Sequence, residues 1–78
     1  MRKVFMKGLN DDLHCDLSYD VDVIVYIMSI GKALDAITFE TELLGSEVID
    51  LIKKFKLDKS LIEKINKDNK YLVTAYDW

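Results

Sequence analysis

A chain of 78 residues has room for one hydrophobic core, so we expect a single domain over residues 1–78. Half of the residues are apolar and 32% are charged, which is typical of a globular protein and excludes a disordered one. The formal net charge is −3. Cys15 is the one cysteine, so no disulfide can form within the chain, and a cytoplasmic setting, in a bacterium or a host cell, is expected.

Neither the N-terminal segment nor the most apolar run predicts a membrane segment. Three basic residues among the first seven are followed by acids at positions 11, 12 and 16, with no apolar stretch of the kind a signal peptide needs. The most apolar run, residues 23–28, is far shorter than the roughly 20 residues that cross a bilayer. We therefore expect no contact with a membrane.

The first 19 residues predict a β-hairpin. Alternate residues from 13 to 19 are apolar or aromatic, which is the period of a half-buried strand. A strand over residues 3–9 precedes it, and residues 8–12 have the composition of a turn. Either face of this first strand offers apolar residues; we favour Val4 and Met6 inward, because the opposite face carries two lysines.

From residue 20 onward the apolar period changes to that of a helix. Spacings of four, three, four and three place five residues on one stripe: Val23, Ile27, Ile30, Leu34 and Ile37. Asp20 suits the N-cap, and Asp22 suits the positive end of the helix dipole. The β-branched run 21–27 is also compatible with a strand, but the length of the stripe favours a helix.

The last 34 residues predict two more helices and a strand. Gly45 is a suitable end for the preceding helical region, and Ser46 and Asp58 are suitable N-caps for the two helices that follow. Residues 71–76 are rich in strand formers. The predicted fold class is α+β: a small three-stranded antiparallel sheet, made of the N-terminal hairpin and the C-terminal strand, covered by about three helices in the order ββαααβ.

The sequence contains no pattern that predicts an enzyme. His14 and Cys15 are the only histidine and cysteine, and neighbours on a strand point to opposite faces, so they cannot act as base and nucleophile in one chain. One histidine and one cysteine are also too few for a zinc site. The three glycines stand apart in the sequence, so there is no glycine-rich phosphate-binding loop. We predict no catalytic residue, metal or cofactor. A site formed between subunits, with His14 facing acids of another chain, is a third class that stays open.

Charge placement is the more informative signal. Residues 8–50 hold ten acids against Lys32 alone, whereas residues 51–70 hold seven lysines against three acids. Clustered carboxylates steer association with cationic surfaces, so we predict a non-enzymatic interaction protein that binds and inhibits a macromolecular partner. A solvated strand face and a helix cap also account for the acids. The residues predicted to contact a protein partner are Asp11, Asp12, Asp16, Asp20, Asp22, Glu40, Glu42 and Trp78.

A small nucleic-acid-binding regulator is the alternative function. Two short helices joined by a tight turn suggest a helix-turn-helix, and their lysines would contact phosphates. The residues concerned are Lys53, Lys54, Lys56, Lys59, Lys64 and Lys67. We place this alternative second, because the lysines alternate with core residues and the region has no arginine.

Two groups of apolar residues could either belong to the core of the monomer or contact another chain. Ile24, Val25 and Met28 lie off the main stripe of the predicted helix, so they either contact the other helices or form a homodimer interface. Trp78 either covers the small core or anchors a partner.

In size, acidity and lack of a catalytic motif the chain is similar in type to small proteins of phages and mobile elements, among them inhibitors of host defence systems and antitoxins. No specific residues carry this likeness. It implies a partner that is a bacterial defence or toxin protein.

Overall fold

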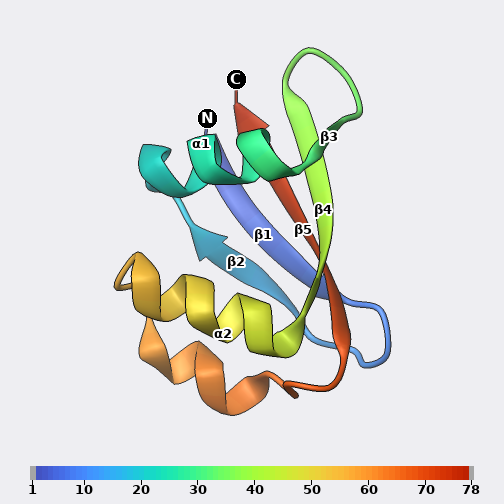
Figure 1. Cartoon of the computed structure of the whole chain (residues 1–78), viewed down its shortest axis with the longest axis vertical. Coiled ribbons are helices and arrows are strands. Elements are labelled where there is room, and N and C mark those ends of the chain that lie inside the picture. Colours follow the sequence, from blue (N-terminus) through green and yellow to red (C-terminus); the bar gives the residue numbers. More distant parts are fainter. Residues whose placement is uncertain (1, 78) are drawn as a thin grey trace.

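A five-stranded antiparallel sheet carries all the helices on one of its faces (Figure 1). The computed structural model describes residues 2–77. The elements in chain order are β1 (Arg2–Gly8), β2 (His14–Ser18), α1 (Val21–Ile30), β3 (Lys32–Ala33), β4 (Thr38–Leu44), α2 (Gly45–Lys54), the 3-10 helix η1 (Lys59–Lys64) and β5 (Lys70–Asp77). The strand order across the sheet is β2-β1-β5-β4-β3, so β5 is the central strand.

The prediction of a three-stranded sheet is wrong, because two further strands lie in the region assigned to the first helix. The N-terminal hairpin is present, and β5 pairs with β1 from Arg2↔Asp77 to Gly8↔Tyr71. The other edge of β5 is occupied by β4, which in turn pairs with the short β3. The element order within residues 2–77 is therefore ββαββα, then η1 and β5; the α+β class and the number of about three helices are as predicted, with the third helix being the 3-10 helix η1.

Helix α1 ends seven residues before the end of its predicted stripe, and Gly31 explains why. The Gly31 amide donates to the Ile27 carbonyl and ends the helix. A Cβ at this position would lie 2.8 Å from the Glu40 carbonyl oxygen, so only glycine lets the chain fold back against β4 at this distance. Leu34 and Ile37 then fall in an exposed turn rather than on the helix.

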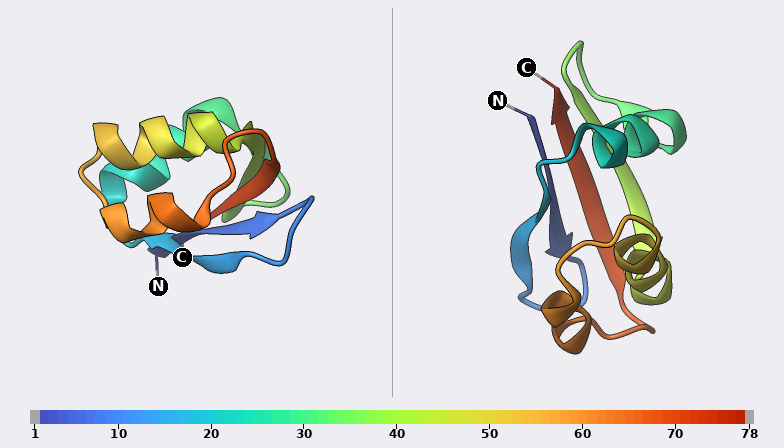
Figure 2. Two further views of the ribbon diagram at one scale, coloured as in Figure 1. Left: turned by 90° about the horizontal axis from the view of Figure 1, so that it is seen from below. Right: turned by 90° about the vertical axis from the view of Figure 1, so that its left-hand side faces the viewer.

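The core lies between the sheet and the helices. Val4 and Met6 point inward as predicted and are fully buried. Helix α1 crosses one end of the sheet and α2 the other (Figure 2). Their buried side chains meet those of the central strands; the core residues are Val4, Met6, Leu17, Val23, Ile24, Ile27, Val48, Leu51, Ile52, Leu61, Ile65, Tyr71, Val73 and Ala75.

A β-bulge in the first hairpin changes the facing of β2. Val4 pairs with Ser18 and Phe5 with Asp16, so Leu17 is the extra residue. Leu17 is buried as alternation predicts, but Ser18 after the bulge is buried as well, and Tyr19, which alternation would turn inward, is 61% exposed.

Both C-terminal helices begin with hydrogen bonds to a side chain. Glu47 accepts from the Leu44 amide at 2.9 Å at the start of α2, and Asp58 accepts from the Ser60 amide at 3.0 Å at the start of η1. Gly45, predicted to end a helix, instead begins α2. None of the helices within residues 2–77 has the length and apolar character needed to cross a membrane.

Gly45 is the position where we expect a single methyl group to be most damaging. A Cβ there would lie 2.0 Å from the Asn66 carbonyl oxygen, which belongs to the backbone and cannot rotate away. Gly45→Ala should therefore lower the free energy of unfolding by about 1–3 kcal/mol. Urea denaturation measures this, with the exposed neighbour Ser46→Ala as the control; equal stability of the two variants would contradict the packing shown here.

Candidate functional site

The face of the sheet opposite the helices is the largest surface without a covering element within residues 2–77 (Figure 2). Residues that pair directly in an antiparallel sheet share a face, so the register defines this surface, which we call the open face. It consists of Lys3, Phe5, Lys7, His14, Asp16, Lys32, Thr38, Glu40, Glu42, Leu72, Thr74 and Tyr76.

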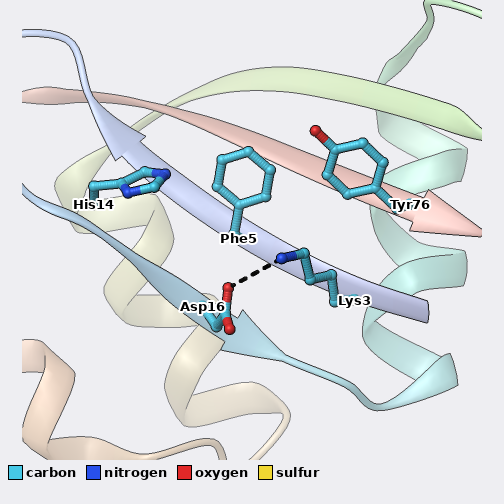
Figure 3. A pocket seen from close by; sticks show the side chains of 5 residues that line it. All are labelled: Lys3, Phe5, His14, Asp16 and Tyr76. Carbon is cyan, nitrogen blue, oxygen red and sulfur yellow. Dashed lines mark ion pairs between the residues drawn. The ribbon is translucent and has the colours of Figure 1, made fainter. Parts of the chain in front are cut away.

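An aromatic cluster occupies one half of the open face (Figure 3). The rings of Phe5 and Tyr76 stack with centroids 5.5 Å apart and planes 8° apart, and the His14 ring meets Phe5 edge-on at 5.4 Å. Together with Lys3 and Asp16 these side chains line a shallow hollow of about 390 Å³.

Strand register brings these residues together from distant parts of the chain. Lys3 lies opposite Tyr76, and Phe5 lies between Asp16 on β2 and Thr74 on β5. The Lys3 ammonium is 3.8 Å from Asp16 and 5.7 Å from the centre of the Phe5 ring. Thr74, between the two aromatic positions, is only 5% exposed, so the hollow has a closely packed floor.

His14 and Cys15 lie on opposite sides of the sheet. His14 lies on the open face, whereas Cys15 pairs with Met6 on the core side, and burial raises the pKa of the Cys15 thiol. No group of three or more potential ligands within residues 2–77 is placed to hold a metal ion. Aromatic faces, one ammonium and one carboxylate are the groups that the hollow offers to a ligand.

The predicted partner-binding acids do not form one surface. Asp16 lies at the β2 side of the open face, and Glu40 and Glu42 lie on the far side of β5. Asp20 caps α1, accepting from the Asp22 amide at 3.0 Å. Asp12 is exposed in the hairpin turn, and Trp78 lies outside the described residues.

Asp11 has a structural role that its sequence context does not reveal. Its carboxylate accepts hydrogen bonds from the Asn69 amide group at 3.0 Å, the Leu13 backbone at 3.0 Å and the Tyr71 hydroxyl at 2.8 Å. Those bonds hold the pKa of Asp11 below its ordinary value of 3.8. Burial raises the pKa of Tyr71, which keeps its hydroxyl protonated as the donor. We call this group the Asp11 clamp.

The three residues considered for self-association have different environments. Ile24 is 1% exposed and belongs to the core, and Met28 packs against that core. Val25 is 57% exposed on the outer side of α1. Only Val25 is therefore available to a partner without a change in the monomer.

The lysine-rich region is exposed, but it does not have the geometry of a helix-turn-helix. All six lysines named above are solvent-exposed, and Lys54 lies 4.6 Å from the centre of the Tyr26 ring. The second helix, η1, is a 3-10 helix of six residues. A recognition helix in a major groove is an α-helix whose first turns reach base edges, and η1 is too short for that role.

Sequence reasoning did not identify Phe5, Tyr76 and His14 as one cluster. The available signal was the face opposite Val4 and Met6, where Phe5 stands between two lysines. Tyr76 of the cluster comes from β5, and the alternation of apolar residues does not show which strands lie on either side of β5.

Comparison with protein-family models, with curated proteins and with solved structures finds no match to this chain.

The Asp11 clamp predicts a specific pH dependence. A carboxylate with a lowered pKa in the folded state contributes stability that is present above its ordinary pKa, near 4, and is lost as the pH falls through the folded value. Asp11→Asn should be less stable than wild type at pH 7, and its stability should fall less between pH 5 and about pH 2.

Thermal unfolding across this pH range tests the prediction, with Asp12→Asn as the matched control in the same turn. We expect Asp12→Asn to follow the wild-type curve. Parallel curves for Asp11→Asn and wild type would show that the clamp does not contribute to acid sensitivity.

Proposed function

We propose that this chain is a non-enzymatic interaction protein that uses its open face to bind, and by binding to inhibit, a protein partner. One observation carries the proposal: the sheet face without a covering element in residues 2–77 has an aromatic cluster on its β2-β1-β5 half, with charges around it.

The composition of the open face supports a protein contact. Aromatic residues at the centre of an interface supply most of its binding energy, and polar residues at the rim exclude water and set specificity. Phe5 and Tyr76 are half-buried and rest on the packed sheet, so little side-chain entropy remains to be lost when a partner covers them.

The charges on this face favour protein over nucleic acid. Lysines and carboxylates alternate across the sheet, and Asp16, Glu40 and Glu42 would lie close to any backbone phosphate that followed the strands. Nucleic-acid affinity depends on neutralising phosphates with cations, so three carboxylates on the contact face oppose it. Alternating signs instead match the mixed polar rims of protein partners.

Inhibition is the action that we infer for a contact of this kind. A small domain that offers only aromatic and charged contacts acts on its partner by occupying a surface that the partner otherwise uses. Small proteins of phages and mobile elements that block defence or toxin proteins work in this way, so we propose that class of partner.

Removing a ring of the aromatic cluster from the open face should weaken the complex. We expect Phe5→Ala and Tyr76→Ala each to reduce affinity about thirtyfold, which corresponds to a residue at the energetic centre of an interface. The measurement is titration calorimetry with the stoichiometric partner recovered from a bacterial lysate, after circular dichroism shows that the variants are folded.

The matched control is Val25→Ala, which removes an exposed apolar side chain from the helix side of the molecule. If the Phe5 and Tyr76 variants keep their affinity for the partner and the Val25 variant loses it, the contact surface lies on α1 and not on the open face. Tight binding of a single-stranded oligonucleotide that weakens steeply with salt would instead support the nucleic-acid function.

A further inference from the structure

The charges on the open face reverse sign on passing from one side of β5 to the other. On one side, β1 carries Lys3 and Lys7, and the outer strand β2 carries Asp16. On the other, β4 carries Glu40 and Glu42, and the outer strand β3 carries Lys32. Each inner strand therefore has the opposite sign to its counterpart, and so has each outer strand.

We propose that the open face binds a second copy of this chain, face to face, about a two-fold axis that runs along β5. Rotation about this axis places each strand on one side above its counterpart on the other side. Lys7 then faces Glu42 of the second copy, because both lie in the cross-strand row of Leu72. Asp16 likewise faces Lys32 of the second copy, because both lie in the row of Thr74.

The centre of the contact consists of the side chains that lie on the axis. Leu72 and Tyr76 lie on the open side of β5 and each meets its own copy, whereas Thr74 between them is buried and forms the floor of the contact. These positions carry no charge, so they can meet across a two-fold axis without repulsion. The stacked Phe5 ring lies beside them on β1, where the same rotation places it opposite Glu40 of the second copy, so the uncharged part of the contact is the strip along β5.

The other two-fold axis in the plane of the sheet, at right angles to the strands, gives the opposite result. That axis places the row of Phe5 on its own copy, so Asp16 meets Asp16, Glu40 meets Glu40 and Lys32 meets Lys32. It also brings Lys3 against Lys7. Like charges in contact cost several kcal/mol, so the charge pattern selects the axis along β5.

The size and geometry of the face allow this contact. Packed sheets lie about 10 Å apart with strands crossing near −30°, so long side chains from facing strands can span the gap although the rows are not in perfect alignment. The whole molecule measures 32 × 24 Å across its two longer axes, so a contact of roughly 800 Å² per subunit, the size of an ordinary specific interface, would need most of the open face. Within residues 2–77, Lys7, Glu42 and Lys32 take part in no ion pair, so they are available to the second copy.

Self-association on this face would regulate the proposed function, and this consequence rests on that function. The second copy and the inhibited partner would compete for Phe5 and Tyr76, so the dimer would be a resting form that dissociates when the partner binds. The dimer itself does not depend on any partner. It is therefore tested on the purified protein alone.

Light scattering of the purified chain should show a concentration-dependent rise from the 9.0 kDa monomer mass to twice that mass. Lys7→Glu and Glu42→Lys should each weaken the dimer about tenfold or more, because each reversal breaks two ion pairs and creates two like-charge contacts. An equimolar mixture of the two variants should recover the dimer, since both contacts between one copy of each variant again join a carboxylate to an ammonium. The exposed Lys53→Glu, on α2, is the control and should dimerise like wild type.

A wild-type chain that stays monomeric at millimolar concentration would overturn the proposal, as would a mixture that stays as weak as its components. Circular dichroism checks that both variants fold. If one does not, the salt dependence of the wild-type dimer decides: the dimer should weaken as ionic strength rises, and a salt-independent dimer would contradict the charge pairing. If the variants lose the dimer but still bind the partner, the proposed function stands. If the dimer forms as expected but no partner is bound, the dimer stands and the proposed function fails.

Discussion

The hydrogen bond from the Tyr71 hydroxyl to the Asp11 carboxylate fixes the register on which the rest of the structure depends. Tyr71 is fully buried at the start of β5, and an unsatisfied hydroxyl there would be costly, so the strand begins where the Asp11 clamp can accept its proton. Because β5 pairs with both β1 and β4, its register decides the facing of most of the sheet. A slip of one residue would turn Val73 and Ala75 outward and the charged open face toward the helices.

The same register explains why aromatic and charged groups share the open face. Alternation along β5 turns Tyr71, Val73 and Ala75 toward the helices, which places Leu72, Thr74 and Tyr76 on the open face, where Leu72 and Tyr76 are half-buried and Thr74 is buried. A sheet covered on one side only is common among antiparallel sheets, and its second face is usually polar. Here Phe5 and Tyr76 interrupt that polarity with a stacked pair, which is the feature that suggests a contact surface rather than a merely solvated one.

The predictable parts of this fold were those with local signals. The alternation at 13–19 and the turn residues at 8–12 identified the hairpin, and Asp20 and Asp58 identified two helix starts. The β3–β4 hairpin was missed because Leu34 and Ile37 continued the helical spacing of α1 by coincidence. Phe39, Thr41 and Leu43 alternate with Glu40 and Glu42 in the period of a strand, a signal that the prediction did not use. The aromatic cluster depends on pairing between β1 and β5, nearly the whole chain apart, and no local pattern specifies such a contact.

The ends of the described chain lie side by side, since Arg2 pairs with Asp77 in the sheet and its guanidinium is 2.8 Å from that carboxylate (Figure 1). Contacts between residues so far apart in sequence raise the contact order, which slows folding. A circular permutant that joins these ends by a short glycine-rich linker and opens in the exposed 34–37 turn would keep every strand pair while making β5 and β1 consecutive. The β1–β5 contact would become a hairpin contact between neighbouring segments, so the permutant should fold faster than the natural chain although the sheet is the same.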